Sequence, residues 1–349
     1  MSKVLTVVGA RPQFIKAAPV SKALQAVGCQ EFLVHTGQHY DESMSERFFR
    51  ELGLSPPDEN LHVGSSSHGA QTGAMMAGLE PIVMERRPDW LLVYGDTNST
   101  LSGALVAAKL HIPVAHVEAG LRSFNRAMPE EVNRLVTDHL STLLFAPTDT
   151  AIKNLALEGI AGDKVRLVGD VMYDAALAAP LDGTAALLDR LNLTTKEFCL
   201  ATVHRAENTD VPARLQAILQ GLAAVAERMP VILPCHPRTK PLVGDVCGVT
   251  VIEPLGYNET ACLLRAAAVV ATDSGGLQKE AYFHGTPCVT LRDETEWVEL
   301  VELGWNTLAP PLSASAVESA ILGAVGTNGR DGTPYGQGDA AAKIAEALA

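Results

Sequence analysis

Short runs of β-branched and other apolar residues alternate along the chain with longer stretches in which apolar residues recur at helical spacing. The run Trp90-Leu-Leu-Val-Tyr94 is apolar throughout, as expected of a strand buried on both faces. Such alternation predicts βαβ units and a parallel sheet covered by helices on both sides. In the first half of the chain the predicted strands are 4–8, 31–35, 90–94, 114–117, 143–146 and 165–168, and the predicted helices are 13–26, 70–87, 99–110, 130–139 and 149–157.

The same pattern restarts after Gly169. The predicted strands there are 198–203, 231–234, 249–252, 269–272, 288–291 and 306–308, and the predicted helices are 174–191, 211–229, 258–266, 276–283, 294–302 and 314–325. Pro180 should break or kink the first of these helices, and Ser313 should cap the last. We therefore expect an α/β protein with two Rossmann-like, doubly wound domains, 1–169 and 170–335, and a cleft between them for a ligand. A closing helix in 336–349 could pack back on the first domain.

Composition narrows the class of protein. A chain of 349 residues with 47% hydrophobic residues is long enough for two globular domains. A net charge of −13 argues against nucleic-acid binding. The six cysteines include no Cys-x-x-Cys pair, so we expect neither a zinc site nor a disulfide framework, and a reducing cytoplasm fits best. No run of apolar residues has the length of a signal peptide or a membrane span.

The stretch 114–134 joins a short apolar strand to a helix through a polar loop. Pro129 suits the first turn of the helix, and Glu130 and Glu131 suit the positive end of its dipole, so these acids can be helix-end chemistry alone. Glu118 is different, because a carboxylate directly after a buried strand lies where α/β sheets bind ligands. Spacing alone leaves open whether this stretch is a site.

The loop after the first predicted strand is Gly9-Ala-Arg-Pro-Gln-Phe-Ile-Lys16. A glycine turn before a helix N-terminus can bind an anion, and Arg11 and Lys16 add positive charge. A lysine near a helix N-terminus opposes the dipole unless an anion is bound there. A solvated Lys16 on an ordinary helix is the alternative.

Asp96 follows the third predicted strand. It could serve as the N-cap of the next helix, but Thr97 and Ser99 can do the same. Because a cap is available without it, Asp96 is a candidate functional carboxylate.

His204 and Arg205 end the first core strand of the second half. A lone histidine is more often structural, but beside an arginine at a ligand-binding sheet edge it becomes a plausible phosphate partner. Residues 235–239 have the same form, although Pro237 can simply shape a turn there.

A strand runs into Ser274, Gly275 and Gly276 and then into a helix that carries Glu280. The glycines would let backbone N–H groups approach a diphosphate, and Glu280 could accept two ribose hydroxyls. The spacing differs from Gly-x-Gly-x-x-Gly, so a dinucleotide cofactor is not indicated. The alternative is that the two glycines only make the turn between strand and helix possible and bind nothing.

Taken together, these motifs resemble the non-hydrolysing UDP-N-acetylglucosamine 2-epimerase family over nearly the whole chain. The resemblance rests on the order and spacing of short motifs at 9–16, 95–100, 116–122, 129–134, 204–205, 236–237 and 273–280. It implies the glycosyltransferase B architecture, in which two Rossmann-like domains have the active site between them. It also implies a homodimer, no cofactor and no metal, and a role in supplying cell-surface polysaccharide synthesis.

The resemblance implies a role for each candidate residue. Ser274, Gly275, Gly276 and Glu280 would hold the phosphates and ribose of UDP, Arg11, Lys16, His204 and Arg205 would contact the substrate's diphosphate, and Asp96, Glu118 and Glu130 would act as acid and base around the sugar, with His204 also counted as catalytic. UDP would be eliminated to give a 2-acetamidoglucal and then added back with the proton on the other face of C2.

The sequence departs from the better-known bacterial members at Trp297, where they carry an arginine, and in the loop between Glu118 and Glu130, which is shorter here. Ser67 stands where an activating second nucleotide sugar would require arginine, although Gln38 is present. We expect UDP-N-acetylglucosamine as the substrate, with UDP-2,3-diacetamido-2,3-dideoxyglucuronate as the alternative. A glycosyltransferase, a hydrolysing relative and a non-catalytic UDP-sugar sensor are the other hypotheses.

Overall fold

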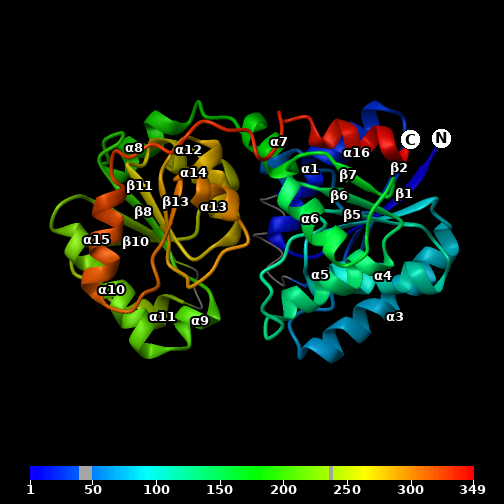
Figure 1. Ribbon diagram of the computed structural model, residues 1–349, viewed down its shortest axis with the longest axis horizontal. Helices are drawn as coiled ribbons and strands as arrows, with labels where there is room; N and C mark the ends of the chain where they lie inside the picture. The colour runs from blue at the N-terminus through cyan, green and yellow to red at the C-terminus, as the bar shows by residue number, and fades with distance from the viewer. Residues whose placement is uncertain (39–48, 236–238) are drawn as a thin grey trace. The chain divides into compact units, whose positions relative to one another are not determined.

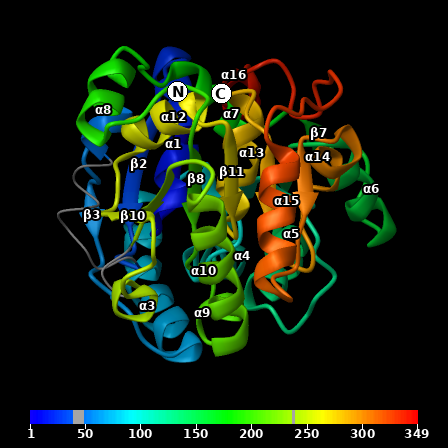
Figure 2. The ribbon, with the colours of Figure 1, turned by 90° about the vertical axis from the view of Figure 1, so that its left-hand side faces the viewer.

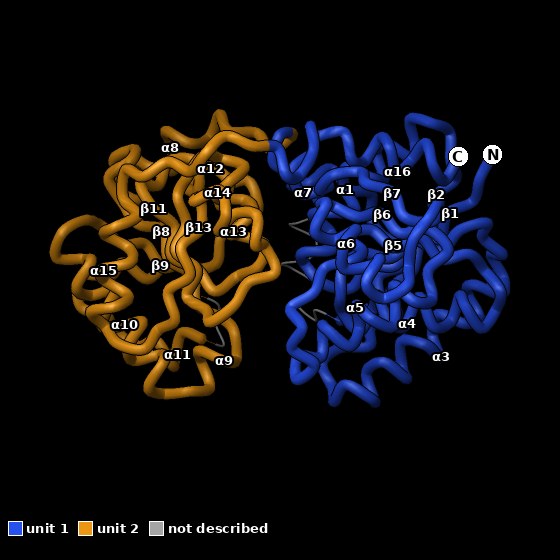
Figure 3. The backbone as a smooth tube through the Cα atoms, viewed as in Figure 1, with its two compact units in different colours: residues 1–177, 333–349 blue, residues 178–332 orange. Residues whose placement is uncertain are grey.

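The computed structural model describes residues 1–38, 49–235 and 239–349. The chain divides into two compact units (Figure 3): unit 1 is Met1–Leu177 with Thr333–Ala349, and unit 2 is Ala178–Gly332. The division therefore falls between Leu177 and Ala178, a few residues after the boundary expected at 169/170. The closing helix α16 (Ala340–Leu348) belongs to unit 1 and packs against α1 (Arg11–Ala26).

Unit 1 is built on one sheet whose described strands are all parallel. Its strands are β1 (Lys3–Val8), β2 (Gln30–His35), β3 (Glu59–Asn60), β4 (Trp90–Tyr94), β5 (Val114–Val117), β6 (Leu143–Ala146) and β7 (Val165–Leu167), and its further helices are α3 (His68–Arg86), α4 (Asn98–Lys109), α5 (Pro129–Leu140), α6 (Asp149–Leu157) and α7 (Val171–Ala178). The strand order β3-β2-β1-β4-β5-β6-β7 reverses direction between β1 and β4. In such sheets, ligands bind at the carboxyl ends of the strands beside this switch point.

Helices cover both faces of the unit 1 sheet (Figure 1). On one face, α3 packs on α4 and α4 packs on α5. The core there joins Leu5 and Val7 of β1 and Leu91 and Val93 of β4 to Leu79 of α3. On the other face lie α1 and α16. Strands buried on both sides explain why the apolar runs in the sequence are nearly continuous.

Unit 2 repeats this topology with strand order β10-β9-β8-β11-β12-β13. Its strands are β8 (Cys199–Thr202), β9 (Val231–Pro234), β10 (Val249–Ile252), β11 (Val269–Thr272), β12 (Cys288–Thr290) and β13 (Asn306–Leu308), and its helices are α8 (Thr184–Leu191), α9 (Ala206–Thr209), α10 (Pro212–Ala226), α11 (Lys240–Val243), α12 (Tyr257–Ala266), α13 (Gly275–Phe283), α14 (Val298–Leu303) and α15 (Ala314–Ala324). The switch point here lies between β8 and β11.

Successive residues of β8 enter opposite cores of unit 2. Cys199 and Ala201 pack with residues of α10 and α15, which lie side by side in Figure 2. Leu200 packs on the other side, with residues of α8, α12 and α13. This alternation is the period of two that a strand imposes on its side chains. Both units are therefore doubly wound sheets, as the sequence predicted.

The predicted elements differ from the structure in a few places. The helix expected over 174–191 is two helices, α7 and α8, and their separation around Pro180 confirms the break predicted there, because proline cannot donate a backbone hydrogen bond. The helix expected from residue 294 begins only at Val298. The strand β3 and the short helices α9 and α11 were not predicted, because two to four residues give no measurable periodicity. In the described part of the chain, no helix has the length and apolarity needed to cross a membrane.

Candidate functional site

The loops with candidate functional residues in unit 1 follow neighbouring strands at the switch point. The loop after β1 leads to Lys16, the loop after β4 carries Asp96, and Glu118 comes directly after β5. Because the strands are parallel, their carboxyl ends meet at one edge of the sheet. Fold topology alone therefore brings these three charged residues together.

Gln13 joins the first two of these loops. Its side-chain carbonyl accepts from the backbone N–H groups of Gly9 at 2.8 Å and Ala10 at 3.1 Å, and its amide donates to the carbonyl oxygen of Tyr94 at 2.9 Å. Gly9 leaves no room for a side chain, since a Cβ there would lie 2.1 Å from the hydroxyls of both Thr36 and Ser99. The glycine at the end of β1 is thus required by packing, and the loop is rigidly attached to β4.

Glu118 is buried and forms an ion pair with the buried Lys16. Its backbone has φ of 70°, a left-handed conformation, and its N–H donates to the carbonyl oxygen of Phe145 at 3.1 Å. Such strained backbone in a non-glycine residue often marks a functional position. The negative charge beside Lys16 is the Glu118 carboxylate. The unfavourable position of a lysine near a helix N-terminus is therefore compensated within the protein and does not by itself require a bound ligand.

Gly95 lies between these charges. Its φ is 62°, and a Cβ there would lie 3.0 Å from Lys16 Nζ and 3.3 Å from Glu118 Oε2. Glycine is therefore needed for both conformation and space.

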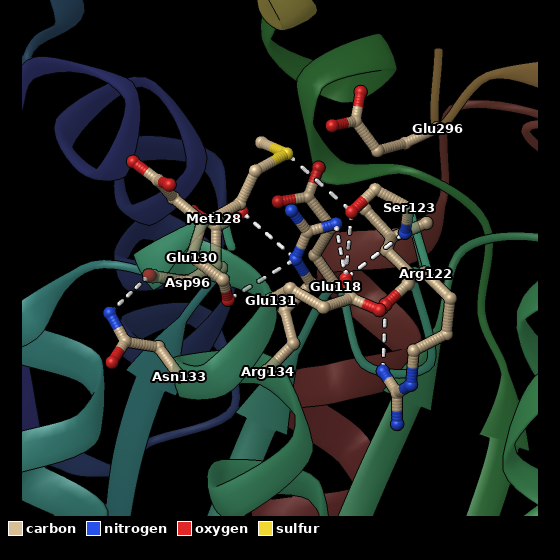
Figure 4. Close-up of polar contacts among 12 residues, drawn as sticks. Asp96, Glu118, Arg122, Ser123, Met128, Glu130, Glu131, Asn133, Arg134 and Glu296 are labelled. Atoms are coloured by element: carbon tan, nitrogen blue, oxygen red, sulfur yellow. Dashed lines mark hydrogen bonds and ion pairs between the residues drawn. The ribbon is translucent and has the colours of Figure 1, made fainter. Parts of the chain in front are cut away.

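Asp96 is not the cap of α4, because Thr97 accepts from Thr100 N–H and fills that role. The Asp96 carbonyl oxygen accepts from Asn133 at 2.8 Å, and its carboxylate lies 3.3 Å from Arg134 Nε (Figure 4). Its side chain keeps 34% of its surface exposed. Burial of the group raises the pKa of Asp96, and Glu118 and Glu130 raise it further against the opposing charges of Arg134 and Lys16. A carboxyl group whose pKa is raised among other carboxylates is suited to holding a proton.

The neighbouring acids at the start of α5 have different environments. Glu130 is exposed, whereas Glu131 is 1% exposed. Glu131 accepts from the backbone N–H groups of Ser123 and Phe124, both at 3.0 Å, and lies 3.5 Å from Arg134 Nη1 (Figure 4). Glu131 is in the first turn of α5, as expected for helix-end chemistry, and its carboxylate also fixes the loop before α5. Glu130 remains accessible, as a reacting group must be.

In unit 2, Asp273 organises the loop after β8. This fully buried carboxylate accepts from the backbone N–H groups of His204 and Arg205 at 3.0 Å, and from Asn208 Nδ2 at 3.1 Å. It also lies 3.0 Å from His204 Nδ1. Burial acts to raise the pKa of Asp273, but the His204 hydrogen bond and charge and the backbone donors outweigh it and lower that pKa. The His204 side chain itself is 52% exposed, so its Nε2 edge is accessible.

Helix α13 begins at the carboxyl end of β11. Ser274 is its N-cap and accepts from Leu277 N–H, and Gly275 and Gly276 are its first residues. A Cβ on Gly275 would make only ordinary contacts, 3.7 Å from Arg205 Nη2 and 3.8 Å from Trp297 Nε1. Neither packing nor a left-handed φ explains this glycine, in contrast to Gly9 and Gly95. A ligand that approaches the backbone would explain it.

The remaining predicted residues lie as follows. Glu280 is buried on α13, and its charge contributes to raising the pKa of Tyr257, after the larger effect of burial. Arg11 is partly buried at the first position of α1. The motif at 236–237 lies outside the described residues. The structure thus groups Lys16, Asp96 and Glu118 in unit 1, and His204, Arg205 and Ser274–Gly276 in unit 2.

Trp297, the position at which this chain departs from the better-known bacterial sequences, is buried beside the start of α13. Lys279 is fully buried with its ammonium 3.9 Å from the centre of the Trp297 ring. This distance permits a cation–π interaction, which would hold the indole against α13.

Sequence reasoning missed several supporting residues: Gln13, His116, Asn133, Asp138 and Asp273. Their partners are far away in the sequence, so no local spacing reveals them. Four of them, Gln13, His116, Asn133 and Asp273, lie within the motifs on which the family resemblance rests, and His116 and Asp273 also lie near strand ends, but no role for them was inferred from the sequence.

Comparisons with known proteins identify the family. The family model for UDP-N-acetylglucosamine 2-epimerase matches residues 22–349. A UDP-2,3-diacetamido-2,3-dideoxy-D-glucuronate 2-epimerase from Pseudomonas aeruginosa is 50% identical, with 99% of each chain covered. A UDP-N-acetylglucosamine 2-epimerase homolog from Methanococcus maripaludis is 47% identical, also with 99% of each chain covered.

Among solved structures, the crystal structure of Methanocaldococcus jannaschii UDP-GlcNAc 2-epimerase in complex with UDP-GlcNAc and UDP matches with a TM-score of 0.92 and 40% identity, covering 99% of both chains. The fold is accordingly the glycosyltransferase B type that the sequence predicted. With a family model over most of its length and relatives that match it from end to end, the chain belongs to the UDP-N-acetylglucosamine 2-epimerase family.

Proposed function

We propose that the protein inverts C2 of a UDP-linked 2-acetamido sugar, and that this sugar is UDP-2,3-diacetamido-2,3-dideoxy-D-glucuronate. The observation that carries the choice of sugar is the 50% identity over 99% of both chains with the Pseudomonas aeruginosa enzyme of that name. This choice replaces UDP-N-acetylglucosamine, which the sequence alone favoured.

The reaction needs both acids and bases. The proton on C2 is not adjacent to a carbonyl group, so direct abstraction is difficult. Breaking the C1–O bond to UDP first builds positive charge at C1 and makes the C2 proton removable, which leaves a 1,2-unsaturated sugar. UDP then adds back to C1 while C2 takes a proton on its other face. One face of the sugar therefore needs a base and the other an acid.

The carboxylates of unit 1 suit this chemistry. Glu118 is paired with Lys16, which favours its charged form, whereas the raised pKa of Asp96 favours retention of a proton. Two carboxyl groups in environments that differ in this way are a common basis for separate acid and base roles. Glu130, which is exposed nearby, would be the third participant.

Unit 2 would bind UDP. The N–H groups at the start of α13 offer a diphosphate site, with room beside Gly275 and the side chains of Arg205 and His204 in the neighbouring loop. Glu280 would accept the ribose hydroxyls. No redox cofactor or metal enters the proposed reaction.

UDP-N-acetylglucosamine is the second candidate substrate. It is supported by the family description and by the 40% identical Methanocaldococcus jannaschii structure, whose complex contains UDP-GlcNAc. A turnover assay with both nucleotide sugars at equal concentration distinguishes the candidates. We expect kcat/KM for the diacetamidoglucuronate nucleotide to exceed that for UDP-N-acetylglucosamine by roughly 100-fold or more, since a site built for a polar group discriminates strongly against its absence. An equal or reversed preference contradicts the choice of sugar.

We also propose that the protein is a cytoplasmic homodimer, on the basis of its resemblance to the family. Light scattering coupled to size-exclusion chromatography measures the mass in solution. A mass of one 36.9 kDa chain would contradict the dimer.

A further inference from the structure

A chain of buried polar contacts runs through unit 1 behind the candidate carboxylates. His116 of β5 is fully buried, with Nε2 2.7 Å from the carbonyl oxygen of Gly95 and Nδ1 2.7 Å from Asp138 Oδ1. Asp138 Oδ2 accepts from Gly120 N–H at 3.1 Å and lies 2.8 Å from Arg122 Nη1. Arg122 continues the chain to Glu158, to which it donates from Nε at 2.7 Å and from Nη2 at 2.6 Å.

The two partners of His116 are hydrogen-bond acceptors. A carbonyl oxygen can only accept, and so can an ionised carboxylate. Burial acts to raise the pKa of Asp138, but the contacts with His116 and Arg122 outweigh it and lower that pKa, so the group is a carboxylate. The His116 ring therefore bridges the two loops, with Nε2 facing the Gly95 carbonyl oxygen and Nδ1 facing the Asp138 carboxylate.

The contact with Gly95 fixes the backbone next to Asp96. Gly95 N–H donates to Val117 O at 3.0 Å, the Gly95 carbonyl oxygen accepts from His116, and the Asp96 carbonyl oxygen accepts from Asn133 at 2.8 Å. The main chain of the Gly95–Asp96 pair is thus held by three hydrogen bonds, while the Asp96 side chain keeps 34% of its surface accessible. A fixed backbone with an accessible side chain is what precise proton transfer requires.

We propose that His116 and Asn133 are positioning residues for Asp96, with Asp138 setting the orientation of His116. The inference rests on the proposed function, because it assumes that Asp96 takes part in proton transfer at C2. Neither side chain contacts the substrate in this account: His116 and Asn133 act only by holding the two carbonyl oxygens on either side of the Asp96 backbone.

Two substitutions of His116 separate positioning from simple stabilisation. In His116→Gln the side-chain amide reaches the position of Nε2, so the hydrogen bond to Gly95 is kept and the one to Asp138 is lost. In His116→Asn the amide reaches the position of Nδ1, so the reverse holds. Both variants replace the imidazole ring with a carboxamide, and the two side chains differ in size by one methylene group.

We expect kcat of His116→Asn to fall roughly 100-fold below that of His116→Gln, the cost typical of a displaced catalytic group. KM for the nucleotide sugar should stay within about 3-fold, since the proposed UDP site lies in the loops of unit 2. With substrate deuterated at C2, the isotope effect on kcat should be larger in His116→Asn, because proton transfer becomes slower. Equal kcat values in the two variants would overturn the proposal.

Asn133→Ala tests the same point without altering the buried charges, and it serves if His116→Asn does not fold. It frees the Asp96 carbonyl oxygen and should lower kcat at nearly constant KM; an unchanged kcat would also overturn the proposal. Glu158→Gln is the control at the outer end of the chain of contacts: it should reduce thermal stability but leave kcat and KM unchanged. If the wild-type enzyme incorporates no solvent deuterium at C2, the proposed function fails instead.

Discussion

The two switch points of this protein have the same strand order but different chemistry. In unit 1, the charged groups neutralise one another: Lys16 pairs with Glu118, and Arg134 lies beside Asp96. In unit 2, the buried carboxylate of Asp273 accepts from the backbone N–H groups of His204 and Arg205, and a Cβ at Gly275, the first residue of α13, would make only ordinary contacts. A sheet edge with balanced charges and a carboxyl group of raised pKa is suited to moving protons, whereas an edge where a helix N-terminus begins is suited to holding an anion.

Gly95 in unit 1 and Gly275 in unit 2 differ in the reason why glycine stands there. Gly95 has a left-handed φ, and a Cβ there would crowd the charged ends of Lys16 and Glu118, so the fold itself favours glycine. Gly275 has neither restriction. The same residue type therefore serves packing around the carboxylates in unit 1 and, in our proposal, ligand approach in unit 2.

The largest expected effect comes from removing a charged carboxylate of unit 1. Glu118→Gln keeps the size of the side chain but removes the charge paired with Lys16. We expect kcat to fall by roughly 1000-fold, within the range for loss of a general acid or base. UDP affinity, measured by calorimetry, should change by less than about 3-fold. A comparable loss of UDP affinity would mean that Glu118 belongs to nucleotide binding.

A smaller effect is expected from Asp273→Asn, which weakens the support of the His204 loop. Because the pKa of Asp273 is lowered by folding, its contribution to stability is present above its unfolded pKa of about 4 and is lost as the pH falls through the folded pKa. At pH 7 the variant should be less stable by about 2 kcal/mol. Urea unfolding at pH 7 and pH 3 measures this, and the difference from wild type should shrink at pH 3. A difference that is independent of pH would contradict the assignment of a charged Asp273.

The smallest expected effect comes from Gly275→Ala. The added methyl group makes only ordinary contacts, so the melting temperature should be unchanged or slightly raised, since alanine favours helix more than glycine. UDP binding should nevertheless weaken roughly 10-fold, about the cost of one lost hydrogen bond. Gly95→Ala is the matched comparison, because it should lower stability. Unaltered UDP affinity in Gly275→Ala would remove the main support for a diphosphate site at α13.

Much of the fold could be predicted from the sequence, because continuous apolar strands and helical periodicity are local signals. The order of strands also placed Asp96, Glu118, His204 and Ser274 at strand ends, where the structure has them. Local spacing failed for Lys16, whose partner Glu118 is 102 residues away in the sequence, and for Glu131, whose role depends on how the 123–124 loop folds back. The contact between His116 and Asp138 could not be predicted either, because these residues are 22 positions apart and meet only in the folded chain.

The most direct test of the account is epimerisation of UDP-2,3-diacetamido-2,3-dideoxy-D-glucuronate in deuterated water, followed by NMR at C2. The account predicts that both epimers acquire deuterium at C2, because the carbon loses its proton to the protein and regains one that has exchanged with solvent. Interconversion of the epimers without deuterium at C2, or release of free sugar and UDP without epimerisation, would contradict it.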